Sequence, residues 1–265
     1  RILLTISFLH ALNSPFTLTP RLLPASWMHT MTKHSLLQLL IFLFTPASPF
    51  TIPKRCNLHM RHGRQSETPK IPIRFLGKGP NAVIREGCVL VAPRHESTHY
   101  LMKSAIFIHA IGIDEYGQHV TRGVIIDYPT AFTMGEMSAG SVVGSLAGNI
   151  LFRGGDMGGD KAMMLHSAGE PVSSKSIGTS GVYEGGLEMA IAAIEEGIVE
   201  ADQFKFFFNR VEFTDGELES LLNEMDSEGD AWTSVEVPPS LILNGDLNKA
   251  EAWMSLRNQL KEIAR

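Results

Sequence analysis

Three residues of the sequence have the types and spacing of a zinc-protease signature. His95, Glu96 and His99 form the pattern HExxH. In that pattern, two His side chains one helical turn apart bind the same zinc ion, and the Glu acts as general base on a zinc-bound water. One hypothesis is therefore a zinc-dependent hydrolase that uses HESTH, with His95 and His99 as metal ligands. The chemistry requires that the motif lie on a helix.

The sequence around the motif does not predict that helix. The motif follows a short apolar run at residues 88–92, which has the composition of a buried strand and is closed by Pro93. The known zinc-protease signatures need a third His or Glu in a fixed frame, and the nearby His109 and His119 lie in a predicted strand and a predicted turn. We therefore interpret HESTH as a polar loop after a strand, and we predict no metal site and no cofactor.

Other residue types that carry out catalysis do not lie in catalytic patterns. Cys88 is the only thiol after residue 78 and lies inside an apolar run, where a buried, unreactive thiol is expected. The Ser residues of SAGS and GTSGV miss the spacing of the nucleophile elbow. The glycine-rich FRGGDMGGDK, residues 152–161, matches neither the dinucleotide-binding nor the phosphate-binding loop pattern. These observations favour a non-enzymatic protein over an enzyme.

The hydrophobic pattern after residue 80 predicts a single α+β domain. Short apolar runs rich in β-branched and aromatic residues predict strands over 88–92, 105–111, 123–127, 149–153, 162–165 and 204–211. Apolar stripes predict helices over 187–198, 218–225 and 250–263. Thr214 and Glu217 have the spacing of a capping box, and Asp246 is the expected cap of the last helix. Because strands and helices alternate irregularly, a regular βαβ succession is not expected.

Charge divides the chain into two unequal parts. Residues 1–78 contain ten Lys and Arg and one acidic residue, whereas residues 79–265 contain thirteen Lys and Arg and twenty-seven Asp and Glu. The first part therefore carries +9 and the second −14. Such asymmetry is typical of a basic targeting segment joined to an acidic globular domain. Because an acidic surface repels phosphate backbones, the charge argues against nucleic-acid binding by the domain.

The N-terminal part has the composition of targeting sequence. Residues 1–30 show no sustained period, and we expect an upstream or unstructured segment. Residues 31–49 have the three parts of a signal peptide: a basic start (MTKH), an apolar run (LLQLLIFLF) and a small-residue cleavage region (TPASPF). Spanning a bilayer takes about 20 apolar residues, more than this run offers, so no stable membrane span is expected in the mature protein.

The segment after the signal peptide is similar to an organellar transit peptide. Residues 50–78 are basic and contain Glu67 as their only acidic residue. A signal peptide followed by a transit peptide resembles the bipartite presequence of algae with complex plastids, in which a Phe follows the cleavage point, as in ASPF at 47–50. We therefore expect a plastid protein whose single domain covers residues 79–265. The alternative is an ordinary secretory signal, with the protein secreted or held in the endomembrane lumen.

Several segments of the predicted domain together resemble the YqgE/AlgH family, whose members are uncharacterised and sometimes labelled transcriptional regulators. The resemblance runs from about residue 86 to residue 253. Its segments, in order, are GCVLVAP, AIFIHAIGIDEYGQHVTRGVIID, YPT, LFRGGD, MMLHS, GVYEGGLEMA and FKFFFNRVEFTDGELESLL. Where the family has Asn-Arg-Pro this chain has DYP, and where it has Gly-Gly-Pro this chain has GGD. The chain is thus identified as a divergent member of the family.

The resemblance implies a fold and a region for the site. The family fold is a bifurcated, largely antiparallel sheet that forms a pseudo-barrel with a few flanking helices. The matching motifs place a ligand- or partner-binding groove near Gly154, Gly155 and His166, with Arg153 beside it and Asp127 at the position where this chain departs from the family.

The resemblance supplies no reaction, because the family has no established one. The leading hypothesis is therefore a non-enzymatic module of the plastid that binds a protein or a small ligand. A DNA-binding transcriptional regulator, as the family label suggests, and a zinc hydrolase remain the alternatives.

Overall fold

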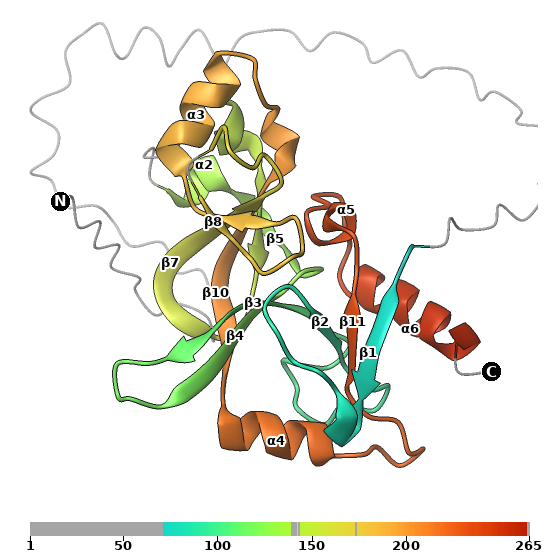
Figure 1. Ribbon diagram of the computed structural model, residues 1–265. Helices are drawn as coiled ribbons and strands as arrows, with labels where there is room; N and C mark the ends of the chain where they lie inside the picture. The colour runs from blue at the N-terminus through green and yellow to red at the C-terminus, as the bar shows by residue number, and fades with distance from the viewer. Residues whose placement is uncertain (1–70, 139–141, 143, 173, 264–265) are drawn as a thin grey trace, which may run out of the picture. The chain divides into compact units, whose positions relative to one another are not determined.

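Within the residues that the structure describes, eleven strands form one continuous sheet. The structure is a computed structural model and describes residues 71–138, 142, 144–172 and 174–263 (Figure 1). In spatial order the strands are β1 (Arg74–Lys78), β11 (Thr233–Glu236), β2 (Val89–Val91), β3 (Ala105–Ile113), β4 (His119–Ile125), β10 (Phe204–Thr214), β7 (Met157–His166), β9 (Tyr183–Glu184) and β8 (Lys175–Ser176). Beside this path, β5 (Pro129–Thr133) pairs with β6 (Ile150–Arg153). All pairings are antiparallel except the parallel pair β6 and β10.

The sheet branches at β10, which changes partners along its length. Residues 204–208 pair with β7, and residues 206–208 of the same stretch also pair with the parallel strand β6. Residues 211–214 pair with β4 instead. Between the two stretches, Asn209 adopts a left-handed φ of 60° at a shift in register. The bifurcated α+β fold that the family resemblance implied is therefore confirmed.

Closure of the sheet into a pseudo-barrel, as the resemblance also implied, is wrong for the described residues. The strand order ends at β1 on one side and at β8 on the other, and among the described strands no pairing joins these two edges. The physical reason is the weak edge at the β8 side, because β8 and β9 contain two residues each and offer little backbone for a further strand. The sheet is open.

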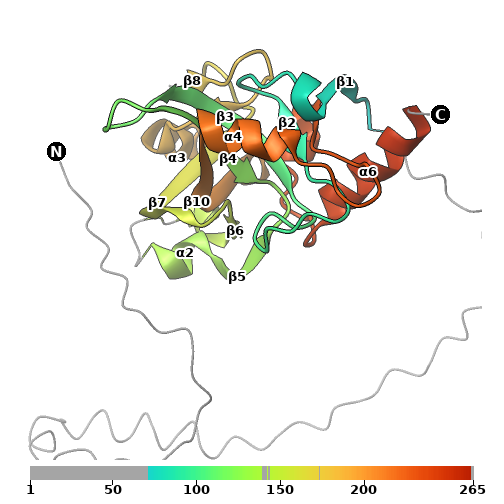
Figure 2. The same ribbon diagram turned by 90° about the horizontal axis from the view of Figure 1, so that it is seen from below.

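Helices cover the two ends of this branched sheet. Figure 1 and Figure 2 show α2 (Met134–Met137) and α3 (Leu187–Glu195) at one end, α4 (Asp215–Asn223) at the other, and α6 (Glu251–Ile263) beside β1. The remaining helical turns are α5 (Pro239–Ile242), η2 (Gly79–Asn81), η3 (Gly144–Gly148) and η4 (Ala201–Gln203). Two hydrophobic clusters meet across β10: Phe206 belongs to one and Phe207 to the other, because successive side chains of a strand point to opposite faces.

Local sequence signals predicted the ends of some helices and missed others. The capping box of α4 is confirmed, since Thr214 and Glu217 exchange both hydrogen bonds. Asp246 as the cap of the last helix is wrong: α6 begins at Glu251, whose carboxylate accepts hydrogen bonds from the backbone and side-chain amides of Asn248. Residues 74–78, which the sequence placed in the basic segment 50–78, form β1 and pair with β11. The folded part therefore begins earlier than residue 79.

The branch point depends on close backbone approach at Gly154 and Gly155. A Cβ on Gly155 would overlap the backbone of Arg210, and one on Gly154 would overlap the carbonyl oxygen of Asn209. Both collisions involve backbone atoms, which cannot rotate away as a side chain can. The paired glycines thus let the end of β6 lie against the point where β10 changes partners.

We expect Gly155→Ala to lower the free energy of unfolding by about 3 kcal/mol, the cost of overpacking a rigid site. The matched control is Gly216→Ala in α4, where an added Cβ meets nothing within 4 Å. Because alanine favours the helix, the control is expected to change stability by less than about 1 kcal/mol, in the stabilising direction. Urea denaturation measures both variants. Equal stabilities of the two variants would contradict the packing role of Gly155.

Candidate binding site

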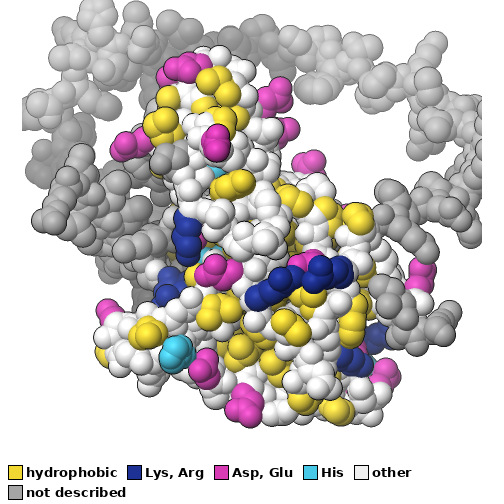
Figure 3. All heavy atoms as spheres, viewed as in Figure 1, with side chains coloured by type: hydrophobic (Ala, Val, Ile, Leu, Met, Phe, Trp, Pro, Cys, Tyr) yellow, Lys and Arg dark blue, Asp and Glu magenta, His cyan; other side chains and the backbone are white. Residues whose placement is uncertain are grey.

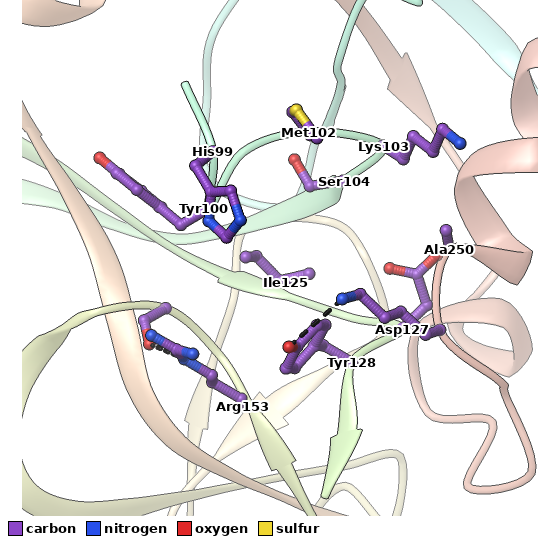
Figure 4. Close-up of a pocket in the computed structure, with 12 residues that line it drawn as sticks. His99, Tyr100, Met102, Lys103, Ser104, Ile125, Asp127, Tyr128, Arg153 and Ala250 are labelled. Carbon is purple, nitrogen blue, oxygen red and sulfur yellow. Dashed lines mark hydrogen bonds between the residues drawn. The ribbon is translucent and has the colours of Figure 1, made fainter. Parts of the chain in front are cut away.

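Four segments far apart in the sequence enclose a cavity of about 430 Å³. They are the loop after β2, the end of β4 with the residues that follow it, the end of β6, and the residues just before α6 (Figure 4). Figure 4 shows His99, Tyr100, Met102 and Lys103 on one side of the cavity and Tyr128 and Arg153 on the opposite side. The volume lies within the range of small-molecule sites. We call this cavity the β4–β6 pocket.

Three basic side chains surround the β4–β6 pocket. Lys103, Arg153 and Lys249 are exposed, and none of them pairs with a carboxylate in the described part of the chain. Lys249 lies 4.4 Å from the ring centre of Tyr128 and donates to its hydroxyl at 3.3 Å. The guanidinium of Arg153 lies 5.9 Å from the same ring, and its Nε donates to the carbonyl of Gly155. The rim therefore combines positive charge with an aromatic face.

A buried carboxylate forms the floor of the β4–β6 pocket. Asp127 is 1 % exposed, and its Oδ2 accepts a hydrogen bond from the backbone N–H of Trp253 at 3.0 Å. Its backbone carbonyl accepts from the N–H of Ala250, so Asp127 ties the start of α6 to the end of β4. Among the described residues, its Oδ1 has no hydrogen-bond partner. Burial raises the pKa of Asp127 to about 6, against the lowering effects of the Trp253 N–H and the charge of Lys205.

A buried lysine lies behind the pocket. The ammonium of Lys205 donates to the carbonyls of Ile126, Ile242 and Asn244 at 2.7, 3.1 and 2.7 Å. Its nitrogen also lies 3.9 Å from the ring centre of Phe152. Burial lowers the pKa of Lys205 to about 7, and the nearby charge of Asp127 opposes that effect. Lys205 thus joins β10 to the end of β4 and to the segment between α5 and α6.

Of the site residues predicted from the sequence, the structure brings together Asp127, Arg153 and Gly155 at the β4–β6 pocket. Gly154 lies next to them, but its backbone is committed to the sheet: its N–H donates to Phe208 and its carbonyl accepts from Ile125. Arg153 and Gly155 therefore border a cavity, and a binding role for these residues stays a prediction.

His166 does not belong to that pocket, so a groove containing both the paired glycines and His166 is wrong. The ring is fully buried, its Nδ1 accepts from the N–H of Ala168, and its Nε2 lies 3.2 Å from the carbonyl of Gly185. It also packs against the rings of Tyr183 and Phe204. Burial lowers the pKa of His166. These contacts describe a neutral structural histidine.

The HESTH segment is a loop, as the sequence context predicted. Glu96 is buried, with one carboxylate oxygen accepting from the indole N–H of Trp232 at 2.8 Å and the other from the N–H of Thr98. His95 lies on the surface 3.6 Å from Glu228, while His99 lines the β4–β6 pocket. Among the described residues, no three His, Cys, Asp or Glu side chains are placed to hold a metal ion. Glu96 therefore fixes the loop to the core.

A second cavity, of about 620 Å³, lies near the C-terminal end of α6. Some of the charged residues that line it form ion pairs with one another: Asp230 pairs with Lys78 at 3.0 Å and with Arg257 at 3.2 Å. Glu228 adds a further negative charge to its lining. The β4–β6 pocket has no acidic lining residue among those described except buried Asp127. Four basic and two acidic residues line the second cavity, and three basic and one acidic residue line the β4–β6 pocket, so both linings carry a formal charge of +2. The difference is that Lys78 and Arg257 pair with Asp230, whereas none of the basic residues of the β4–β6 pocket pairs with a carboxylate among the described residues.

Sequence reasoning missed four residues of the site. Lys103, Tyr128 and Lys249 are brought together by the tertiary fold, and no local pattern distinguishes them from ordinary surface residues. Lys205 did carry a signal, because it lies within FKFFF, an aromatic run that predicts a strand buried on both faces. A lysine in such a strand must find partners inside the protein.

The fold and the site define an open, branched-sheet α+β protein with a cationic pocket over a buried carboxylate. A family model described as AlgH-like matches residues 97–263, so the chain belongs to the AlgH-like family. No curated protein matches the chain at a significant level. Among the helices of the described residues, none is long and apolar enough to cross a membrane.

Two solved structures are similar to this chain. One is a crystal structure of protein DIP2367 from Corynebacterium diphtheriae, with 17 % identity and a TM-score of 0.48, covering 67 % of this chain and 87 % of that one. The other is the solution structure of the AlgH protein from Pseudomonas aeruginosa, with 16 % identity and a TM-score of 0.46, covering 66 % and 87 %. Because both scores lie below 0.5, the family assignment rests on the family model.

Burial of Asp127 makes stability depend on pH in a defined window. The pKa of Asp127 rises from 3.8 to about 6 in the folded protein. Between these values the folded state holds a proton that the unfolded state has released, so stability falls as the pH rises through the window. We expect the wild type to lose up to about 3 kcal/mol across this window relative to Asp127→Asn, which does not titrate.

Urea denaturation of both proteins at several pH values checks this expectation. The Asn side chain retains an oxygen that can accept from the Trp253 N–H, so the variant keeps the tie to α6. A stability difference that does not change between pH 3.8 and about 6 would contradict the burial argument.

Proposed function

We propose that this protein is a non-catalytic binding module whose β4–β6 pocket takes a small anionic ligand. The observation that carries the proposal is the convergence of Lys103, Arg153 and Lys249 on one cavity, without an ion-pair partner among the described residues. The chain from residue 79 onward carries −14. On such an acidic domain, a concave cluster of unpaired cations is the place where an anion is attracted most strongly.

The buried candidates for chemistry support a role without catalysis. His166 uses both ring nitrogens in structural contacts, and Glu96 uses both carboxylate oxygens. Cys88 is fully buried, and burial raises the pKa of its thiol, which disfavours the reactive thiolate. A nucleophile or base that is fixed in this way cannot reach a substrate in the pocket.

A DNA-binding role, suggested by the regulator label of related proteins, is the weaker alternative. Figure 3 shows Asp and Glu side chains interspersed with Lys and Arg over the face that it presents. Duplex DNA is bound through a continuous row of basic residues that neutralises several phosphates. The cationic cluster at the β4–β6 pocket lines a cavity rather than an extended surface.

We also propose that the module acts in a plastid. The support is the signal-like segment 31–49 and the basic residues between 50 and 70, all of which lie outside the described residues. Arg74 and Lys78 belong to β1 of the folded part, so they are not counted as basic residues of a transit peptide. The remaining basic residues of the segment are Lys54, Arg55, Arg61, Arg64 and Lys70.

Calorimetric titration of the full chain with succinate tests the binding proposal. We expect measurable binding that weakens by about tenfold or more in Arg153→Ala and in Lys249→Ala, because each removes a charge-assisted contact. Lys175→Ala is the matched control, since Lys175 is exposed, lies 3.9 Å from Glu86 and does not line the pocket. Binding that is absent, or equally weakened by the control, would refute an anion site at this pocket.

A fluorescent fusion tests the location. Residues 31–70 placed before a fluorescent protein are expected to direct it to the plastid of an alga with complex plastids. The change Phe50→Ala is expected to stop delivery before the plastid stroma, because Phe50 holds the position of the Phe in such presequences. Secretion of the unmodified fusion, or its retention in the endomembrane lumen, would favour the ordinary secretory signal.

A further inference from the structure

The floor of the β4–β6 pocket contains a carboxylate oxygen whose hydrogen-bonding capacity is unused. Oδ2 of Asp127 accepts from the Trp253 N–H, whereas Oδ1 has no partner among the described residues. Figure 4 shows this carboxylate beside Ala250 at the edge of the cavity, with one oxygen turned toward the cavity. An unpaired oxygen of a buried carboxylate is costly, because it has lost water without gaining a donor.

Two other acidic groups, buried Glu96 and half-buried Asp230, show the contrast. Both oxygens of Glu96 accept hydrogen bonds from the protein itself. Both oxygens of Asp230 also contact donors, among them Lys78 and Arg257. Asp127 lines a cavity, and within the described part of the chain it forms no ion pair with the basic residues at the rim. The unused acceptor position of Oδ1 therefore lies in the wall of the cavity, and because less than 1 Å² of this oxygen is exposed, a ligand donor must displace wall atoms to reach it.

The rim of the pocket favours an anionic group of a ligand, whereas the floor favours a hydrogen-bond donor. The rim offers the positive charges of Lys103, Arg153 and Lys249, which suit a carboxylate or another anion. The floor offers Oδ1 of Asp127, which suits an N–H or O–H donor. A ligand that is anionic throughout would leave Oδ1 unpaired and repel it.

We infer that the ligand is a small amphoteric molecule, of the hydroxy-acid or amino-acid class, whose anionic group meets the basic rim while its hydroxyl or ammonium group donates to Oδ1 of Asp127. This inference rests on the proposed function and adds the ligand class to it. Discrimination of this kind is strong, because a site built to pair a donor rejects the analogue that lacks the donor.

Three ligands that share one carbon skeleton and differ in a single substituent test the inference. Succinate, L-malate and L-aspartate are four-carbon dicarboxylates that carry hydrogen, hydroxyl and ammonium at the second carbon. Calorimetric titration of the full chain at about pH 8, above the pKa of Asp127, is expected to give at least about tenfold tighter binding of malate and aspartate than of succinate. In Asp127→Asn this advantage is expected to disappear, and succinate binding is expected to strengthen, because the variant removes both the charged acceptor and its repulsion of an anion.

The outcomes separate the two proposals. Equal binding of the three probes by the wild type overturns the amphoteric ligand but leaves the anion pocket in place. Absence of binding by all three overturns both. Arg153→Ala is the second variant: it is expected to weaken the binding of all three probes alike, whereas Asp127→Asn is expected to remove the differences among them. If Asp127→Asn does not fold, the ranking of the three probes by the wild-type protein still decides the inference.

Discussion

A buried polar junction at the end of β4 holds together the elements that form the pocket. Asp127 fixes the first turn of α6 through Trp253 and Ala250, and Lys205 donates from the other side to three carbonyls in two segments, the end of β4 and the end of α5. Both side chains are almost completely buried, so neither is solvated as a charged group on the surface would be. Removing one partner of such a junction leaves the other uncompensated, which makes the junction a strong constraint on how β4, β10 and α6 are placed.

The pocket is a consequence of that constraint. Lys249, just before α6, lies over the ring of Tyr128, just after β4, and the guanidinium of Arg153 at the end of β6 lies 5.9 Å from the centre of the same ring. Arg153 and Lys249 are thus held by the Gly155 carbonyl and by the ring and hydroxyl of Tyr128 rather than by ion pairs with neighbouring carboxylates. Side chains held in this way keep their charge available to a ligand, since no internal counter-ion has to be displaced.

Local sequence patterns predicted the parts of the fold that depend on local physics. The aromatic run of β10 and the capping box of α4 are examples, since burial on both faces and N-terminal capping each leave a signature within a few residues. β1 and β8 could not be predicted, because they are short, mostly exposed and defined by the partner strand. Of the residues that the family resemblance suggested, Asp127, Arg153 and Gly155 line the pocket and His166 does not, because a motif does not say which cavity a side chain faces.

The most direct test of the account is a map of where an anion binds. In a titration of the isotopically labelled full chain with L-malate, followed by amide resonances in NMR spectra, the account predicts the largest shifts at Ser104, Tyr128, Gly155 and Ala250, around the β4–β6 pocket. Shifts concentrated instead at Lys78, Arg94 and Lys261, which line the second cavity, would contradict it. In that case the buried junction would serve stability alone.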